Sequence, residues 1–270
     1  RSCITTYEGQ TRCDREPTIM NWQGLLVSVR DAKEAKEAIE GGAAIVDVKD
    51  PAAGSLGRAS IQNVVEVARV VCNRLPWTVA AGELRDEIAH PGSILQWVEE
   101  IASCLRSDEA GLPGALKIGL HGVFDLHWKS CLRQVMQSLP SSIKRVAVAY
   151  VDWDRVGAPH PIDVIGFARE QCDIILFDTS DKDGPGLLGC CSQHDLMQWV
   201  SAAHGGHLPV TLAGRLKIDE IQHVSRFQPD VVALRSAVCS NNRLGPVDTD
   251  LVRVATKEVH RLEKSIDGTT

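Results

Sequence analysis

The stretch GLLVSVRDAKEAKEAIEGGAAIVDVKD, residues 24–50, holds one complete unit of a pattern that runs through the whole chain. An apolar run (24–30) is followed by Asp31, a residue type that favours helix starts, and by a segment of helical period. Two glycines (41–42) end that segment, and a second apolar run (44–49) follows directly. Runs that are apolar on both faces are typical of buried parallel strands. The stretch therefore predicts a strand, a helix and a second, parallel strand.

The same alternation continues to the C-terminus. Apolar runs that predict strands stand at 24–30, 44–49, 78–84, 115–120, 145–152, 174–180, 209–214 and 231–239. Segments that predict helices stand at 32–42, 61–75, 93–106, 125–139, 161–171, 192–205, 217–228 and about 248–264. Eight strands, each followed by a helix, make a closed parallel barrel. We predict an α/β protein with a single (β/α)8 TIM barrel as its catalytic domain, residues 21–270. An open doubly wound sheet is the alternative, but the first strand-to-helix turn lacks the glycines that it needs.

Composition limits the partners and the location. The chain has 270 residues, of which 44% are hydrophobic and 24% charged, as in a soluble barrel domain. A net charge of −6 gives no reason to expect nucleic acid or an anionic membrane as partner. Nine cysteines without a C-x-x-C pair indicate a reducing, cytoplasmic setting. Residues 1–20 are polar and aperiodic, which predicts a disordered N-terminal extension.

Charged residues stand at the ends of several predicted strands. In a barrel enzyme the site lies at the C-terminal ends of the strands, and side chains alternate between the two faces of a strand. This places Asp47 and Lys49 on one face of the second strand, Lys117 in the fourth, Asp178 in the sixth, and Lys182 shortly after it. A lone lysine at a strand end is usually a solvated rim residue. A cluster of buried charges must instead pair internally, and such clusters are typical of active sites.

The loops after the seventh and eighth strands predict an anion site. These loops often bind phosphate in barrels through backbone N–H groups. The seventh strand ends at Gly214, and the eighth continues into Arg235, Ser236 and Ala237. Small residues allow close backbone approach, and Arg235 is the expected clamp for the phosphate. A glycine after a strand is common, so this motif is weak when taken alone.

Lysine chemistry is the best supported reaction type. A neighbouring cation and partial burial both lower the pKa of a lysine, so part of it is a neutral amine that can attack a carbonyl. A second lysine or a carboxylate can then transfer protons. The chain has no G-x-S-x-G elbow and no Cys/His pair; His121, which follows the fourth strand, is the one histidine placed near the expected site.

Three motifs resemble a known enzyme family. VDVKDPAAGSLG (46–57), KIGLHGV (117–123) and FDTSDKDG (177–184) are similar to signatures of (5-formylfuran-3-yl)methyl phosphate synthase, a furan-forming TIM barrel of methanofuran biosynthesis. LAGRLKIDEI (212–221) and ALRSAVC (233–239) resemble its last two strands. The similarity runs in order from about residue 24 to 264. CSNNRLGPVD (239–248) departs from the Gly-rich, Arg-containing run of the family, so the resemblance does not extend to substrate contacts in that loop.

The resemblance implies a reaction and a set of roles. Two molecules of glyceraldehyde 3-phosphate, one as its dihydroxyacetone phosphate isomer, condense into a furan aldehyde, and one phosphate and water are lost. This is a lyase reaction, a carbon–oxygen cleavage acting on phosphates, without metal or organic cofactor. The Schiff-base lysine maps onto Lys49 and the proton-accepting lysine onto Lys117. The remaining family residues map onto Asp47, Asp178 and Lys182.

Two other functions stay open. A class I aldolase of another sugar phosphate would use the same lysine and phosphate site, but it needs fewer groups for proton transfer. A non-catalytic barrel would be expected to have lost at least one site lysine. A homo-oligomer is a further open expectation: Trp97 and Trp199 on outer helices are either interface anchors or, more commonly, packed between helix and barrel.

Overall fold

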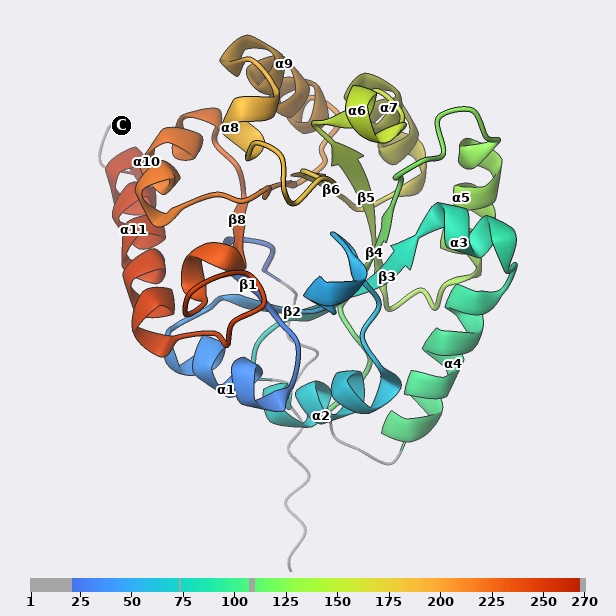
Figure 1. Cartoon of the computed structure of the whole chain (residues 1–270), viewed down its shortest axis with the longest axis horizontal. Helices are drawn as coiled ribbons and strands as arrows, with labels where there is room; N and C mark the ends of the chain where they lie inside the picture. The colour runs from blue at the N-terminus through green and yellow to red at the C-terminus, as the bar shows by residue number, and fades with distance from the viewer. Residues whose placement is uncertain (1–20, 73, 107–109, 268–270) are drawn as a thin grey trace, which may run out of the picture.

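Eight parallel strands close into one barrel in chain order, with β1 paired to β8 (Figure 1). The computed structural model describes residues 21–72, 74–106 and 110–267. The predicted extension, residues 1–20, lies outside this range. The strands are β1 (Gly24–Val29), β2 (Ile45–Val48), β3 (Trp77–Glu83), β4 (Ala115–Gly119), β5 (Lys144–Tyr150), β6 (Ile174–Asp178), β7 (Val210–Leu212) and β8 (Val231–Leu234). This confirms the predicted TIM barrel.

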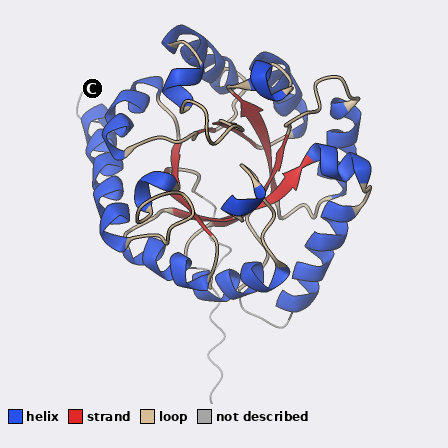
Figure 2. Cartoon of the chain, viewed as in Figure 1, coloured by secondary structure: helices blue, strands red, loops and turns tan. Residues whose placement is uncertain are grey.

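Helices surround the barrel on its outside, as Figure 2 shows. They are α1 (Ala32–Glu40), α2 (Ile61–Val71), α3 (Leu84–Ala89), α4 (Ser93–Leu105), α5 (Trp128–Ser138), α6 (Trp153–Val156), α7 (Pro161–Gln171), α8 (Leu187–Cys190), α9 (Gln193–His204), α10 (Ile221–Val224) and α11 (Thr249–Asp267). Short 3-10 turns are η1 (Pro51–Ala53), η2 (Ile218–Glu220), η3 (Ser225–Phe227) and η4 (Ser236–Val238). Within the described residues, no helix is both long and apolar enough to cross a membrane.

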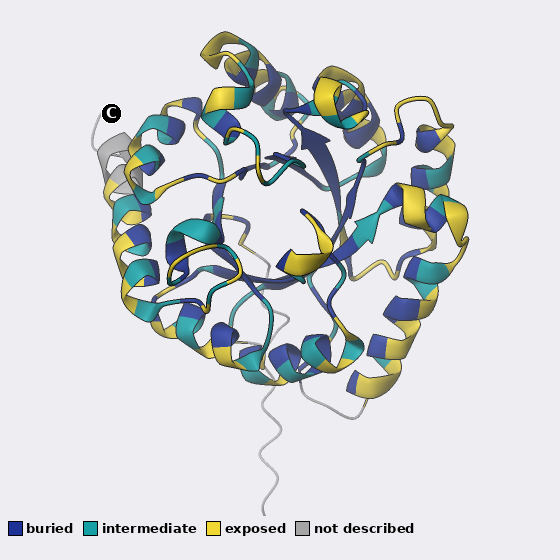
Figure 3. Cartoon of the chain, in the orientation of Figure 1, coloured by how far each residue is buried: buried dark blue, intermediate teal, exposed yellow. Residues whose placement is uncertain are grey.

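Alternate strand residues separate two apolar layers. Ile45 belongs to the cluster inside the barrel, whereas Val46 and Val48 belong to the larger cluster between strands and helices. Figure 3 shows the result: the strands are buried, and the helices expose only their outer sides. Trp97 and Trp199 are 7% and 6% exposed and belong to the outer cluster, so both pack between helix and barrel.

Most predicted boundaries hold, and the differences occur where the chain turns. Asp31, as the sequence indicates, and also Ser60 cap α1 and α2 by accepting hydrogen bonds from backbone N–H groups of the first turn. The short helix α3 was not predicted, because its six residues are too few for a recognisable helical period. The eighth strand ends at Leu234 and not at residue 239, because the chain turns at Arg235 into η4.

A buried ion pair ties the last strand to the first helix. The carboxylate of Glu34, in the first turn of α1, accepts hydrogen bonds from the guanidinium groups of Arg235 and Arg30. Glu34 is 2% exposed and Arg235 is 8% exposed. Burial alone would raise the pKa of the Glu34 carboxyl, but the hydrogen bonds from Arg235 and Arg30 outweigh it and lower the pKa. The pair joins the residue that follows β8 to the first turn of α1, where the barrel closes.

The substitution Glu34→Gln tests the importance of this closure. It leaves two arginines without their buried counter-charge, so we expect the free energy of unfolding to fall by about 3 kcal/mol. Urea unfolding followed by circular dichroism measures the change. Glu40→Gln, an exposed carboxylate on the same helix, is the matched control and should change stability by less than about 0.5 kcal/mol. Equal unfolding midpoints for Glu34→Gln and wild type would contradict the proposed role.

Candidate active site

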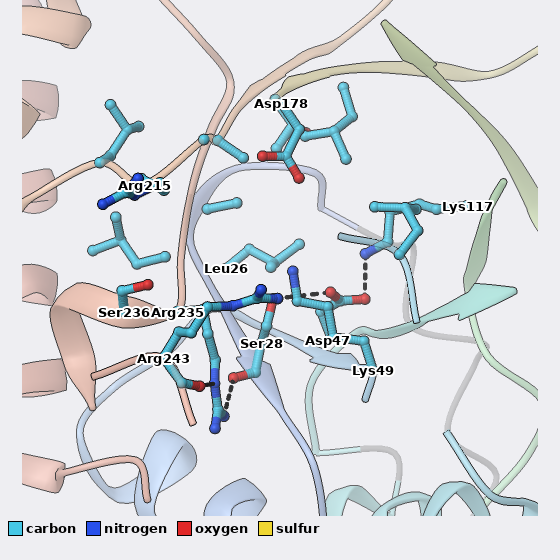
Figure 4. A pocket seen from close by; sticks show the side chains of 18 of the residues that line it. Leu26, Ser28, Asp47, Lys49, Lys117, Asp178, Arg215, Arg235, Ser236 and Arg243 are labelled. Carbon is cyan, nitrogen blue, oxygen red and sulfur yellow. Dashed lines mark hydrogen bonds and ion pairs between the residues drawn. The ribbon is translucent and has the colours of Figure 1, made fainter. Parts of the chain in front are cut away.

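The candidate site is a pocket at the C-terminal end of the barrel. Figure 4 shows its charged side chains, which come from several different strands and the loops that follow them. The charged and polar lining residues are Ser28, Asp47, Lys49, Lys117, Asp178, Lys182, Thr211, Arg215, Arg235, Ser236 and Arg243. All five predicted catalytic residues are among them. Strand alternation therefore brought these residues to one place, as the sequence predicts.

Asp47 is the centre of the first cluster. Ser28, Asp47 and Thr78 are register partners on three successive strands, so their side chains meet inside the barrel. The Asp47 carboxylate accepts hydrogen bonds from Ser28 Oγ at 3.0 Å and from Thr78 Oγ1 at 2.7 Å. It also forms an ion pair with Lys117, whose Nζ donates to Thr78 Oγ1 at 3.1 Å. Lys117 is 3% exposed, so Asp47 holds this ammonium group in a fixed position.

Asp178 organises a second cluster at the end of β6. Its Oδ1 lies 2.9 Å from the Nζ of Lys182 and 2.7 Å from the backbone nitrogen of Thr179. Its Oδ2 accepts a hydrogen bond from Ser55 Oγ at 3.1 Å. Lys182 also donates to the carbonyl oxygen of Thr179. In Figure 4 Asp178 lies apart from the Asp47–Lys117 pair, so the pocket has two separate carboxylate–lysine groups.

Lys49 differs from the other two lysines. Within the described residues, no carboxylate is within ion-pair distance of its amine, although it lines the same pocket. Burial lowers the pKa of the Lys49 ammonium to about 8; Asp178 and Asp47 oppose this shift, and Lys182 and Lys117 add to it. About a tenth of Lys49 is thus a neutral amine at pH 7. Lys49 is the best placed nucleophile in the pocket.

Both carboxylates remain charged. Burial would raise the pKa of Asp47, but the ammonium groups of Lys117 and Lys49 outweigh burial and lower it. For Asp178, burial is likewise outweighed by Lys182 and Lys49, and the pKa falls below its usual value. The two carboxylates can therefore accept protons or stabilise cations.

Arg235 lines the pocket as predicted, but its guanidinium group is already engaged by the protein. Its five N–H donors all meet protein acceptors: two on Glu34, and the carbonyl oxygens of Ser28, Arg243 and Gly245. No donor is left for an anion in this arrangement. Glu34 causes this arrangement, because its carboxylate accepts two of the Arg235 hydrogen bonds. The sequence predicts a helix at Glu34 but does not indicate that its side chain reaches the pocket arginine.

The other predicted phosphate residues divide between the pocket and its surroundings. Gly214 and Ser236 line the pocket, whereas Ala237 lines a hollow on the outer wall between η2 and α11. Gly214 has a φ of +103°, and a β-carbon there would lie 3.1 Å from the backbone nitrogen of Thr179. Glycine is favoured at this position because it adopts a positive φ without strain and lets the backbone approach Thr179 closely.

Sequence reasoning missed two arginines of the pocket and a network beside it. Arg215 and Arg243 lie in loops without periodicity, so no strand pattern indicated them. Outside the lining, Glu83 at the end of β3 accepts hydrogen bonds from the hydroxyl of Tyr150 at 2.7 Å and from the N–H of His121 at 3.0 Å. The His121 ring contacts Ser180 and does not line the pocket. Burial raises the pKa of Glu83.

The arrangement is suited to amine chemistry on a carbonyl compound that carries an anion. Lys49 supplies a partly neutral amine, and the Asp47–Lys117 and Asp178–Lys182 pairs supply proton donors and acceptors nearby. Cationic side chains outnumber the two carboxylates of the lining. In the described part of the chain, no group of three or more His, Cys, Asp or Glu residues could hold a metal ion.

Known proteins resemble this chain over most of its length. The sequence model of the family described as 4-HFC-P synthase matches residues 25–256. A protein of Methanocaldococcus jannaschii named (5-formylfuran-3-yl)methyl phosphate synthase is 34% identical over 239 residues, which cover 85% of this chain and 96% of the relative. A protein of the same name from Archaeoglobus fulgidus is 31% identical over 246 residues, which cover 87% of this chain and 99% of the relative.

Solved structures share the fold. Phosphoribosyl anthranilate isomerase from Thermotoga maritima has a TM-score of 0.55 at 16% identity and covers 88% of this chain and 99% of its own. Thiamine phosphate pyrophosphorylase from Pyrococcus furiosus has a TM-score of 0.54 at 14% identity, and the match covers 90% of this chain and 98% of the pyrophosphorylase chain. At these identities the likeness shows a common fold and nothing about the reaction.

The low pKa of Lys49 predicts a pH dependence. Because the neutral amine reacts, labelling of Lys49 by an aldehyde and borohydride should increase through a midpoint near pH 8 and level off above it. Lys182→Met removes a cation that lowers this pKa, so the midpoint should move to higher pH. Mass spectrometry of the labelled peptide measures both. Lys257→Met, an exposed lysine of α11, should leave the midpoint unchanged. A midpoint near that of an ordinary lysine in the wild type would contradict the assignment.

Proposed function

The chain belongs to the 4-HFC-P synthase family, and from this we propose that it condenses two molecules of glyceraldehyde 3-phosphate into (5-formylfuran-3-yl)methyl phosphate. One phosphate and water leave in the reaction. The single observation that carries the proposal is Lys49, a buried lysine with a pKa of about 8 beside two carboxylate–lysine pairs. We place the reaction in the cytoplasm, in biosynthesis of a methanofuran-type cofactor, and class it as carbon–oxygen lyase chemistry on a phosphorylated substrate.

The first step is imine formation at Lys49. Its neutral Nζ attacks the carbonyl carbon of one triose phosphate, a carbon–nitrogen bond forms, and the carbonyl oxygen leaves as water. The buried carboxylates of Asp47 and Asp178 lie near this centre and oppose the repulsion from Lys182 and Lys117, so they stabilise the positively charged iminium where it forms.

Carbon–carbon bond formation needs an enamine. The Asp47–Lys117 pair removes a proton from the carbon next to the iminium, because it is the buried proton-transfer pair held by Ser28 and Thr78. The enamine carbon then attacks the aldehyde carbon of the second triose. The new alkoxide takes its proton from an ammonium of the cluster.

A hydroxyl oxygen of the condensed chain then attacks a carbonyl carbon to close the five-membered ring, and loss of one phosphate and of water makes the ring aromatic. Lys182, held by Asp178 and the Thr179 carbonyl, neutralises the charge of the leaving phosphate. The backbone at Gly214 and Ser236 lines the pocket and contacts the phosphate that is retained. Hydrolysis of the final imine releases Lys49 and the furan aldehyde.

Trapping experiments on lysine variants test the reaction. Glyceraldehyde 3-phosphate with borohydride should add mass to Lys49 of the wild type, and an unreduced sample should develop furan absorbance. Lys49→Arg should lose the adduct and at least about 10³-fold of the rate. Lys117→Met should keep the adduct but lose about 10²- to 10⁴-fold of furan formation, because only proton transfer is removed. Lys33→Met, an exposed lysine, is the control.

Three outcomes separate the alternatives. An adduct on Lys49 with furan product supports the synthase. An adduct without furan indicates an ordinary class I aldolase of a sugar phosphate. Absence of both from the wild type would sink the Schiff-base proposal and favour a non-catalytic barrel.

A further inference from the structure

We propose that Arg243, assisted by Arg215, is the specificity-determining clamp that binds the phosphate of the second triose, the one that does not form the imine with Lys49. The inference rests on the proposed function and assigns one of its two substrates to a subsite. It also gives Arg235 a positioning role, because that arginine holds the loop on which Arg243 stands.

The positive charge of the pocket exceeds what its chemistry needs. Besides Arg235, which is neutralised by Glu34, five cationic side chains and two carboxylates line the pocket. Lys117 pairs with Asp47, and Lys182 pairs with Asp178. Within the described residues, Arg215 and Arg243 have no carboxylate at ion-pair distance. Two unneutralised guanidinium groups in one pocket call for an anionic ligand.

Both arginines have donors to spare. Arg243 Nη2 donates one hydrogen bond, to the carbonyl oxygen of Gly54 at 3.0 Å, and Arg215 donates to the carbonyl oxygen of Gly184. Each guanidinium group has five N–H donors, and planar pairs of such donors match phosphate oxygens. Arg235, in contrast, has no free donor, because all five of its N–H groups bond to the protein.

The position of Arg243 selects the outer of the two substrates. Its bond to Gly54 spans from the loop between β8 and α11 to the loop between β2 and α2, so it crosses the mouth of the pocket. Figure 4 shows Arg215, Ser236 and Arg243 on one side of the pocket and Lys117 on the other. The first triose must reach Lys49 on the barrel wall, so the second lies between it and the mouth.

Hydrogen bonds from Arg235 hold the loop of the clamp in place. Arg235 Nε donates to the carbonyl oxygen of Arg243 at 3.0 Å, and Arg235 Nη2 donates to that of Gly245 at 3.0 Å. Because the buried ion pair with Glu34 fixes Arg235, it also anchors the loop that carries Arg243. On the other side, Arg215 has a φ of +55°, a conformation that non-glycine residues rarely adopt and that is common at functional sites.

The test compares imine formation with furan formation in Arg243→Gln. We expect kcat/KM for furan formation from glyceraldehyde 3-phosphate to fall about 10- to 100-fold, mainly through KM, as for the loss of a charge-assisted hydrogen bond. Borohydride trapping at Lys49 should stay within about threefold of wild type, because the first triose does not need Arg243. Arg243→Lys should recover part of the loss. Arg253→Gln, on α11 and away from the pocket, is the control.

The possible results distinguish the subsite from the reaction. If Arg243→Gln forms furan with wild-type kcat/KM, or loses Lys49 trapping as strongly as furan formation, the clamp for the second triose is overturned while the synthase proposal stands. If the wild type gives neither adduct nor furan, the proposed function fails, and calorimetric titration with glycerol 3-phosphate tests the clamp alone. Weaker binding to Arg243→Gln than to wild type then supports it, and equal binding rejects it.

Discussion

The carboxylate of Asp47 can remain charged inside the barrel only because neighbouring strands supply its hydrogen-bond donors. Ser28 and Thr78 are its register partners on β1 and β3, and Lys117 reaches it from β4. A strand that slipped by one residue would turn Asp47 toward the helices and leave Lys117 unpaired. A buried unpaired charge is costly, so the register of the barrel and the position of the site depend on each other.

The need of a buried charge for a partner also explains why Lys49 differs from the other two lysines of the pocket. Lys117 and Lys182 each have a carboxylate partner, whereas Lys49 interacts with the carboxylates only at longer range. Burial therefore dominates at Lys49 and lowers its pKa, and the nearby cations reinforce the effect. Burial alone does not distinguish the two lysines, since Lys117 is more deeply buried than Lys49; the difference is that Lys117 has a carboxylate partner.

Strand alternation revealed the barrel and its charged wall because a buried parallel strand fixes the direction of every side chain. Asp47 and Lys49 were recognisable for that reason. Arg243 was not, because the loop on which it stands has no period. The pairing of Arg235 was not foreseen, since its partner Glu34 lies about two hundred residues away and the β8 strand ends one residue before Arg235. Contacts between distant loops leave no local signal in a single sequence.

Strands and loops also carry different kinds of functional group in the proposed site. Groups proposed to exchange protons or form bonds, such as Lys49 and Lys117, stand on or directly after strands, where the register holds them rigidly. Groups proposed to recognise the second phosphate stand on loops, and a loop can position a charge only if something anchors it. The Glu34–Arg235 pair is that anchor for Arg243. The departure of residues 239–248 from the resembled family therefore concerns the loop proposed to hold a substrate, while the lysines proposed to perform the chemistry lie outside it.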